Sequence, residues 1–418
     1  MNEEFTKVIT AGVSHLQEDF DYSMTELKSL CEANNMEVVD TIKQNLDQVV
    51  GATYFGKGKV EELEHLATDS DVQVIVINDE LSPSQIRNLE EQTGLTIIDR
   101  TELILQVFAS RAQTKQSKLQ VEIAQLQYEL PRIHPSGNPL DQQKGGSGTN
   151  RGAGETKLEL DRRVIRNRIT YLKKQLQEID QNLETQNKKR KENSIPTVAL
   201  VGYTNSGKST TMNALLNKSV SSNEDNKVFE KDMLFATLDT SVRNITLADN
   251  TKFLLSDTVG FVNKLPHNLV ESFKSTLAEA SDADLIIQVI DFSDPNFDKT
   301  IAVTDQTLKE VGVVDKPKII AYNKADLKDI SYPQIEGGDL YYSAMDEKSI
   351  DTLIDLIKEH IFKDQKIGKF LIPYTDGNIV SYINENLDII SQMYKDDGTE
   401  FELRLSPLEY KKLAVYLV

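Results

Sequence analysis

Apolar and polar positions in the first 110 residues follow two alternating periods. Short Val- and Ile-rich runs, of which Val72–Asn78 is the clearest, are typical of strands buried on both faces, and apolar residues at helical spacing indicate amphipathic helices. The pattern predicts strands at Phe5–Ala11, Glu37–Lys43, Val72–Asn78 and Leu95–Asp99. It predicts helices between them at Ser23–Ala33, Lys57–Leu66 and Pro83–Thr93. This alternation favours a small parallel α/β sheet.

Two long stretches beyond residue 100 keep a narrower apolar seam. The first seam alternates spacings of four and three: Leu119, Ile123, Leu126 and Leu130. The seams predict one helix over residues 101–130, ended by Pro131, and a second over Glu155–Lys189, which together favour an antiparallel helical hairpin. The loop between them, Pro131–Gly154, is rich in glycine and has no apolar period, as is typical of a functional or disordered segment.

Residues 195–211 place a phosphate-binding motif between a strand and a helix. Val198–Val201 predicts a buried strand, Gly202–Ser209 matches G-x-x-x-x-G-K-[ST], and Thr210 onward predicts a helix. The glycines let backbone N–H groups point at phosphate oxygens, and the helix N-terminus adds positive potential. We expect Lys208 to neutralise β/γ-phosphate charge and Ser209 to ligate Mg²⁺. The predicted phosphate-binding residues are Gly202, Tyr203, Thr204, Asn205, Ser206, Gly207, Lys208, Ser209 and Thr210.

The remaining motifs of a P-loop GTPase follow in linear order, in what we expect to be a doubly wound sheet. Two predicted switch segments comprise Phe235, Ala236, Thr237, Leu238 and Asp239, then Asp257, Thr258, Val259 and Gly260. We expect Thr237 to reach Mg²⁺ and γ-phosphate, Asp257 to hold Mg²⁺ through water, and the Gly260 N–H to sense γ-phosphate. The predicted guanine-binding residues are Asn323, Lys324, Ala325, Asp326, Ser343, Ala344 and Met345. The Asp326 carboxylate can accept from guanine N1–H and N2–H₂, a donor pair that adenine lacks, so GTP and GDP are the expected ligands.

One position departs from the usual GTPase pattern. Phe261 follows Asp257–Gly260 where a glutamine would orient the attacking water, so no catalytic side chain is assigned and slow intrinsic hydrolysis is expected. Asn205 is open to two interpretations. Its side chain is either a ligand for K⁺, which would add positive charge at the transition state, or a residue that simply tolerates the loop backbone.

Charge is distributed unevenly along the chain. The net charge is −19, yet residues 132–191 hold 14 Lys and Arg against 7 Asp and Glu, a local +7. This pattern indicates a nucleic-acid contact within an acidic protein, although a solvated helix face would also produce it. The candidate RNA contacts are Arg151, Lys157, Arg162, Arg163 and Arg166. No apolar run is long enough to span a membrane and the start is acidic, so we expect a cytoplasmic protein without an integral membrane segment, although a peripherally membrane-associated fraction stays open.

Two features of the N-terminal part have ordinary alternatives. The single cysteine, Cys31, lies in a helical pattern and is interpreted as a packing residue in a reducing compartment. Gly56-Lys-Gly-Lys59 opens a helix and is either a structural turn or a phosphate or RNA contact. The five histidines show no metal-ligand spacing.

The last residues predict a small α+β module. Strands are expected at Gly368–Pro373, Ile389–Tyr394 and Phe401–Leu405, with helices at Gly377–Leu387 and Pro407–Leu417 and a hairpin turn at residues 396–398. The predicted domains are then an N-terminal α/β subdomain (1–110), the helical hairpin with its basic glycine-rich loop at 131–154 (111–192), a GTPase domain (193–363) and a C-terminal α+β domain (364–418).

With these residues assembled, the chain resembles the HflX family of ribosome-associated GTPases, which are related to translation factors. The resemblance covers nearly the whole length and is carried by Phe55–Glu62, Asp79–Ser84, Ile98–Leu105, Leu119–Tyr128, Arg151–Leu158 and Gly202–Ser209. It implies a GTPase that binds the large ribosomal subunit through its RNA, is stimulated there, and splits stalled or hibernating ribosomes. The family likewise lacks the catalytic glutamine. Some members act on ATP through the N-terminal domain, which leaves a second, ATPase activity open. Residues 143–150 are less rich in glycine than the family's loop.

The leading hypothesis is therefore a cytosolic, monomeric GTPase with Mg²⁺, and K⁺ as a candidate second ion, whose hairpin contacts ribosomal RNA. A different hypothesis is a ribosome-assembly or RNA-binding factor. In such a factor the nucleotide only controls binding, and nucleotide hydrolysis is incidental. A signalling or trafficking GTPase is disfavoured by the long hairpin and by the absence of a lipidation motif.

Overall fold

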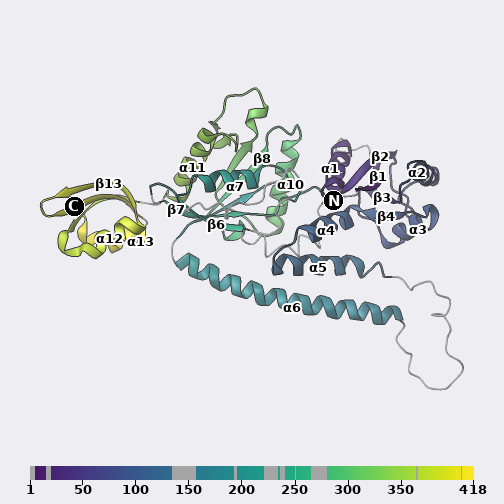
Figure 1. Ribbon diagram of the computed structural model, residues 1–418, viewed down its shortest axis with the longest axis horizontal. Coiled ribbons are helices and arrows are strands. Elements are labelled where there is room, and N and C mark those ends of the chain that lie inside the picture. Colours follow the sequence, from purple (N-terminus) through teal and green to yellow (C-terminus); the bar gives the residue numbers. More distant parts are fainter. Residues whose placement is uncertain are drawn as a thin grey trace, which may run out of the picture. The chain divides into compact units, whose positions relative to one another are not determined.

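Figure 1 shows the chain as a computed structural model, which describes residues 5–15, 20–133, 157–192, 195–220, 234–235, 241–249, 251–264, 280–363, 366–405 and 407–418. Contacts divide the chain into two compact units. The first comprises Met1–Thr185, Met233–Asp239 and Asn263–Ser275, and the second comprises Gln186–Asp232, Thr240–Val262 and Thr276–Val418. Two short segments from beyond residue 185 thus belong to the first unit.

The first unit begins with a four-stranded parallel sheet in the order β2-β1-β3-β4. Its strands are β1 (Thr6–Ser14), β2 (Met36–Asn45), β3 (Val74–Ile77) and β4 (Thr96–Asp99). The helices that connect them are α1 (Phe20–Ala33), α2 (Lys57–Asp69) and α3 (Pro83–Thr93). The expected parallel α/β sheet is confirmed, because Val and Ile on both faces of β1 and β3 are buried under these helices. Helix α3 has the predicted bounds, set by a Ser82–Gln85 capping box and a left-handed Gly94.

The predicted helix over residues 101–130 is wrong in one respect, because it is two helices. Helix α4 (Arg100–Arg111) ends where Ala112 is extended, and α5 (Lys115–Glu129) starts anew at Thr114, whose side chain accepts a hydrogen bond from the Ser117 N–H. A threonine N-cap competes with helix continuation by satisfying the amides of a new first turn. The apolar seam alone does not reveal such a break.

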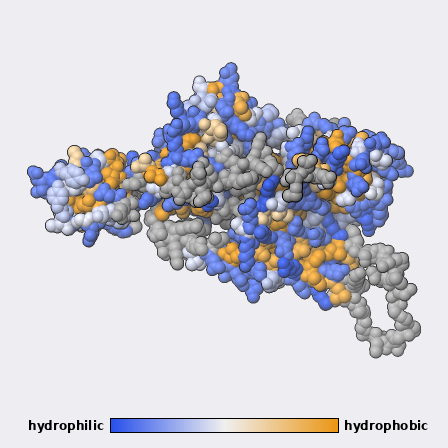
Figure 2. Space-filling view, viewed as in Figure 1, coloured by the Kyte–Doolittle hydropathy of each residue, from blue (hydrophilic) through white to orange (hydrophobic). Residues whose placement is uncertain are grey.

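Helix α5 packs on the long helix α6 (Lys157–Glu192), as the hairpin prediction required. Leu119 and Ile123 of α5 meet Ile169 and Leu172 of α6, and an Arg168–Glu122 ion pair of 2.7 Å flanks them. Figure 2 shows hydrophobic residues over this hairpin. On α6 itself Leu160, Val164 and Tyr171 are exposed. No helix in the described part of the chain has the length and apolarity needed to cross a bilayer.

The second unit contains a seven-stranded sheet in the order β10-β11-β9-β8-β5-β7-β6, parallel except for its two edge strands. Its strands are β5 (Thr197–Val201), β6 (Ser241–Thr246), β7 (Lys252–Asp257), β8 (Leu285–Asp291), β9 (Lys318–Asn323), β10 (Gln334–Glu336) and β11 (Asp339–Tyr341). Its helices are α7 (Lys208–Asn217), α10 (Phe297–Glu310) and α11 (Glu347–Ile361), with a short 3₁₀ turn η3 (Ala325–Leu327). The doubly wound P-loop sheet is confirmed. The antiparallel edge strands β6 and β10 were not predicted, because their polar sequences lack a strand period.

The C-terminal module is a three-stranded antiparallel sheet in the order β12-β14-β13. It comprises β12 (Lys366–Pro373), η4 (Tyr374–Asp376), α12 (Gly377–Asn386), β13 (Asp388–Lys395), β14 (Gly398–Leu405), α13 (Pro407–Lys412) and η5 (Ala414–Tyr416). The β13–β14 hairpin is as predicted, and a Cβ at Gly398 would lie 2.2 Å from the Ile372 carbonyl oxygen. The predicted last helix is too long. It ends at Lys412 because the terminus turns to pair with β12, where the Val418 N–H donates to the Lys369 carbonyl at 2.9 Å.

Candidate functional site

The phosphate-binding loop joins β5 to α7 and is built on close backbone approaches. Gly202 has φ +150° and Gly207 has φ +91°. A Cβ at Gly202 would lie 2.2 Å from the Val289 carbonyl oxygen, and one at Gly207 would lie 2.1 Å from the Asn323 Nδ2. Only glycine fits either position, which explains both glycines of the motif. Asn205, between them, is exposed and left-handed at φ +60°.

The Lys208 side chain folds back onto the phosphate-binding loop. Its Nζ donates to the carbonyl oxygens of Gly202 at 3.1 Å and Tyr203 at 2.7 Å. The side chain is buried, and burial lowers the pKa of Lys208 to about 8, against the opposing effect of the Asp257 carboxylate. A buried ammonium whose partners are neutral carbonyl oxygens is expected to bind an anion, because the anion would compensate for the hydration that the ammonium has lost.

Ser209 and Asp257 meet at the same end of the sheet. The Ser209 Oγ donates to the Asp257 Oδ2 at 2.9 Å, and Asp257 is fully buried. A hydroxyl and a carboxylate oxygen side by side are the hard donors that Mg²⁺ prefers, so the two residues fit the ion that the sequence predicts. The next residue, Thr258, is fixed by its Oγ1 donating to the Leu200 carbonyl at 2.8 Å.

The residues after Asp257 lie directly against the phosphate-binding loop. The Phe261 carbonyl accepts from the Thr204 N–H at 2.8 Å, and the Phe261 N–H donates to the Gly202 carbonyl at 3.2 Å. A Cβ at Gly260 would lie 2.9 Å from the Thr204 Cα and 3.1 Å from the Lys208 Nζ. The Phe261 side chain is buried, so this residue contributes backbone hydrogen bonds to the site in place of a water-orienting side chain.

Asn323 joins the phosphate-binding loop to the predicted guanine loop. Its Nδ2 donates to the Ser206 carbonyl at 2.9 Å, and its Oδ1 accepts from the Ala344 N–H at 2.9 Å. A second bridge, between the buried hydroxyls of Thr211 and Tyr342 at 2.7 Å, was not anticipated, because neither residue lies in a motif. Burial raises the pKa of the Tyr342 hydroxyl.

The other predicted guanine-binding residues lie around this bridge. Lys324 is left-handed at φ +62° and its Nζ contacts the Asp291 carboxylate at 2.7 Å. Asp326 is exposed at the start of η3, Ala325 and Ser343 are buried, and Met345 is 84% exposed. The structure therefore brings the described members of the predicted phosphate-, Mg²⁺- and guanine-binding sets to the carboxyl end of one sheet, where doubly wound folds bind their ligands.

Some predicted residues are placed elsewhere or lie outside the described residues. The described residues do not include 236–239, which contain Thr237, or Arg151. They include Lys157 at the start of α6, but not its side chain. Arg162, Arg163 and Arg166 are on α6, where Arg163 and Arg166 are exposed and Arg162 is half-buried. Gly56 is the N-cap residue of α2, and Lys59 in the first turn contacts Glu62 at 2.6 Å.

Three family models match successive parts of the chain. They are described as GTP-binding GTPase N-terminal (residues 21–109), GTP-binding GTPase Middle Region (111–190) and 50S ribosome-binding GTPase (197–324).

Curated relatives match the chain over nearly its whole length. A protein named GTPase HflX from Caldanaerobacter subterraneus is 41% identical over 94% of this chain and 89% of its own. One of the same name from Alkalihalophilus pseudofirmus is 38% identical over 97% and 94%, and one from Escherichia coli is 33% identical over 93% and 91%.

The bridge through Asn323 generates a prediction. An Asn323→Asp substitution keeps the acceptor for the Ala344 N–H but turns a second oxygen toward the Ser206 carbonyl. We expect the affinity for GDP, measured by fluorescence titration, to fall about 10- to 100-fold, as for loss of one or two buried hydrogen bonds. Asn244→Asp, on the exposed part of β6, is the matched control. Equal dissociation constants for the two variants would contradict the bridging role.

Proposed function

Since this chain belongs to the HflX family of GTPases, we propose that it is a nucleotide switch that acts on the large ribosomal subunit and separates stalled or hibernating ribosomes. GTP binding and hydrolysis follow from the family. The finer proposal is supported by a match of residues 197–324 to a family described as 50S ribosome-binding GTPase. It is also supported by the local charge of the hairpin, because basic residues attract the phosphates of RNA.

The observation that supports the switch is that the phosphate loop, the hydrogen-bonded Ser209 and Asp257, and the loops that begin at Asn323 and Ser343 share one end of the second sheet. Lys208 leaves its two carbonyl partners to bind the β- and γ-phosphates, since an anion compensates its buried charge better than neutral carbonyls do. Gly260 lies beside Lys208, where its N–H reports the γ-phosphate. Asp326 selects guanine. Ser209, with Thr237 and a water on Asp257, would hold Mg²⁺, which neutralises phosphate charge when bound.

The water that attacks GTP needs a partner other than residue 261. We propose that K⁺, held by the exposed Asn205 side chain, supplies positive charge beside the phosphates, and that the ribosome positions the water. The protein is proposed to be a cytoplasmic monomer. Action on ATP through residues 1–110 stays a prediction of the resemblance.

A monovalent-ion test addresses Asn205. We expect GTP turnover to be about tenfold faster in KCl than in NaCl of equal ionic strength, and the difference to vanish in Asn205→Ala. Asn217→Ala, which changes an exposed asparagine at the end of α7, is the control that keeps the K⁺ effect. Equal rates of the unmodified protein in the two salts would exclude the K⁺ proposal.

Base selection depends on Asp326. Asp326→Asn exchanges an acceptor for a donor, so we expect the affinity for GDP to fall about 100-fold or more and that for xanthosine diphosphate to rise. Competition titrations with both nucleotides measure this. Asp329→Asn removes an exposed charge three residues away and is expected to change neither affinity. Normal GDP affinity in Asp326→Asn would mean that another residue reads the base.

Ribosome association is tested by co-sedimentation with large subunits in GDP and in a non-hydrolysable GTP analogue, and by turnover with and without subunits. We expect tighter association with the analogue and faster turnover with subunits. Arg162, Arg163 and Arg166 changed together to Gln should weaken association and reduce the slope of log affinity against log salt by about 2 to 3, while GTP affinity alone is kept.

The same charge removed at Lys7, Lys28 and Lys309, which are exposed elsewhere, is the matched control and should leave the salt slope unchanged. Absence of stimulation by subunits, with association intact, would favour the second hypothesis, a nucleotide-gated assembly or RNA-binding factor in which turnover is incidental. Absence of association would contradict both.

A further inference from the structure

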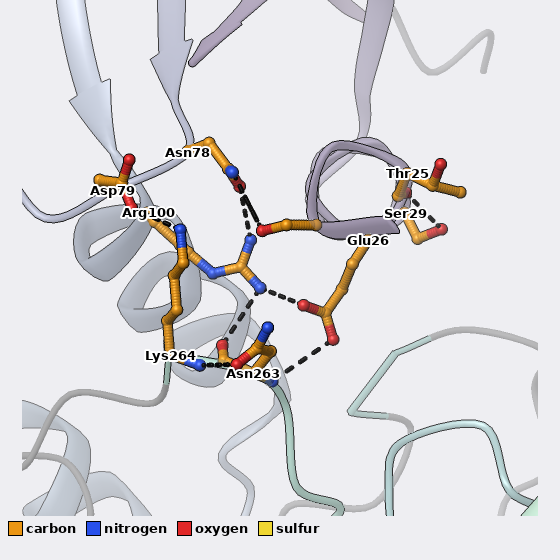
Figure 3. Close-up of polar contacts among 9 residues, drawn as sticks. Thr25, Glu26, Ser29, Asn78, Asp79, Arg100, Asn263 and Lys264 are labelled. Carbon is orange, nitrogen blue, oxygen red and sulfur yellow. Dashed lines mark hydrogen bonds and ion pairs between the residues drawn. The ribbon is translucent and has the colours of Figure 1, made fainter. Parts of the chain in front are cut away.

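A buried arginine in the first unit has no role in the site described above. Arg100, the first residue of α4, follows β4 directly, and its side chain is 1% exposed. Its guanidinium contacts the Glu26 carboxylate of α1, and its Nη1 donates to the Asn78 Oδ1 at 2.9 Å (Figure 3). A buried charge of this kind is stable only when it is paired and its hydrogen-bonding capacity is used.

Part of that capacity is used by a segment from far along the sequence. The Arg100 Nη2 also donates to the Asn263 carbonyl at 3.2 Å, and the Asn263 N–H donates to the Glu26 Oε1 at 3.4 Å. The Arg100–Glu26 pair therefore recognises both backbone polar groups of one residue (Figure 3). Recognition of this kind depends on the position of the backbone and not on the Asn263 side chain.

The next residue is held as well. The Lys264 Nζ forms an ion pair with Asp79, which directly follows Asn78 after β3, and Lys264 is left-handed at φ +54°. Both partners are partly exposed, at 39% and 27% of their side-chain surface. Asn263 comes only three residues after Gly260. A displacement of the second switch segment would therefore strain the contacts of Asn263 with Arg100 and Glu26 and the ion pair of Lys264 with Asp79.

The first switch segment reaches the same helix. Phe235, the first of its predicted residues, is 2% exposed and left-handed at φ +55°. Its ring packs edge-on against Phe108 of α4, with centroids 4.5 Å apart. Helix α4 thus holds residues next to both switch motifs, one at Arg100 and the other two turns later at Phe108.

The place of these contacts in the sheet is also informative. Asn78, Asp79 and Arg100 lie just beyond the carboxyl ends of β3 and β4, in a sheet ordered β2-β1-β3-β4. Doubly wound sheets of this order bind their ligands at that end, where the strand order reverses. In this protein residues 263–264 of the same chain lie at that end of the sheet.

We propose that α4, with Glu26, Asn78 and Asp79, is the element through which the first unit reads the nucleotide state, with Arg100, Phe108 and Asp79 as positioning residues for the two switch segments. Gly260 lies beside Lys208, and Phe261 is hydrogen-bonded to the phosphate loop, so a γ-phosphate bound by Lys208 would displace these two residues, whereas GDP would not. Holding Asn263 and Lys264 therefore favours GDP over GTP, and by reciprocity GTP loosens the contacts on α4. The proposal rests on GTP binding and not on ribosome association.

The experiment compares the full-length protein in GDP and in a non-hydrolysable GTP analogue by amide hydrogen exchange. We expect exchange in residues 100–111 to be faster with the analogue. In Lys264→Ala this difference should shrink by at least half, while the difference in the phosphate loop remains. The ratio of analogue to GDP affinity should rise about 1.5- to 5-fold, the effect that one partly exposed ion pair supplies.

Three further variants separate the ion pair from other effects. Lys264→Arg keeps the charge and should behave as the unmodified protein, and Lys264→Gly, which suits the left-handed backbone, should behave as Lys264→Ala. Lys358→Ala removes the Lys358–Asp249 ion pair of 2.6 Å in the second unit and should have no effect. The proposal is overturned if α4 exchanges equally with both nucleotides, or if Lys264→Ala leaves the difference and the affinity ratio unchanged. Loss of GTP binding itself would instead abolish the response of the phosphate loop.

Discussion

The nucleotide site depends on the side chain of Asn323, which ties together two loops that follow different strands. The amide is suited to this task because it donates through one end, to the Ser206 carbonyl, and accepts through the other, from the Ala344 N–H. The same amide nitrogen lies where a side chain at Gly207 would be, so the tie and the glycine require each other. Phosphate and base recognition are thereby set in one geometry before a ligand arrives, which reduces the ordering cost of binding.

A second constraint governs the residues beyond Asp257. Phe261 uses its backbone, through Thr204 and Gly202, to close the segment over the phosphate loop. Lys208 at the same time satisfies its ammonium with loop carbonyls. In the proposed switch, GTP replaces both sets of contacts, and its binding energy would then move the segment. The absence of a glutamine at residue 261 fits this view, since the buried Phe261 contributes backbone contacts and no water-orienting side chain.

The sequence was a good guide where a pattern is local. Continuous Val and Ile predicted the parallel strands, Ser82 and Pro83 predicted α3 to the residue, and two glycines with a lysine predicted the phosphate loop. It failed where a local choice overrides a period, as at Thr114, which starts a new helix inside a continuous apolar seam. It also failed at the polar edge strand β6, which is held by its pairing with β7. The Thr211–Tyr342 bridge joins residues that are 131 positions apart and carry no motif.

By itself the sequence determined the ligand class and the chemistry of the site, because phosphate, Mg²⁺ and guanine recognition each need particular residue types at short, fixed spacings. Only the tertiary structure decided which distant groups meet. Arg100 and Glu26 are ordinary charged residues in the sequence, and their contact with the backbone of Asn263 arises because the chain returns to the carboxyl end of the first sheet. A contact made to backbone atoms does not require a particular side chain, so no sequence motif marks it. The hydrogen bonds of Arg100 and Glu26 are strengthened by the low dielectric constant of their buried surroundings.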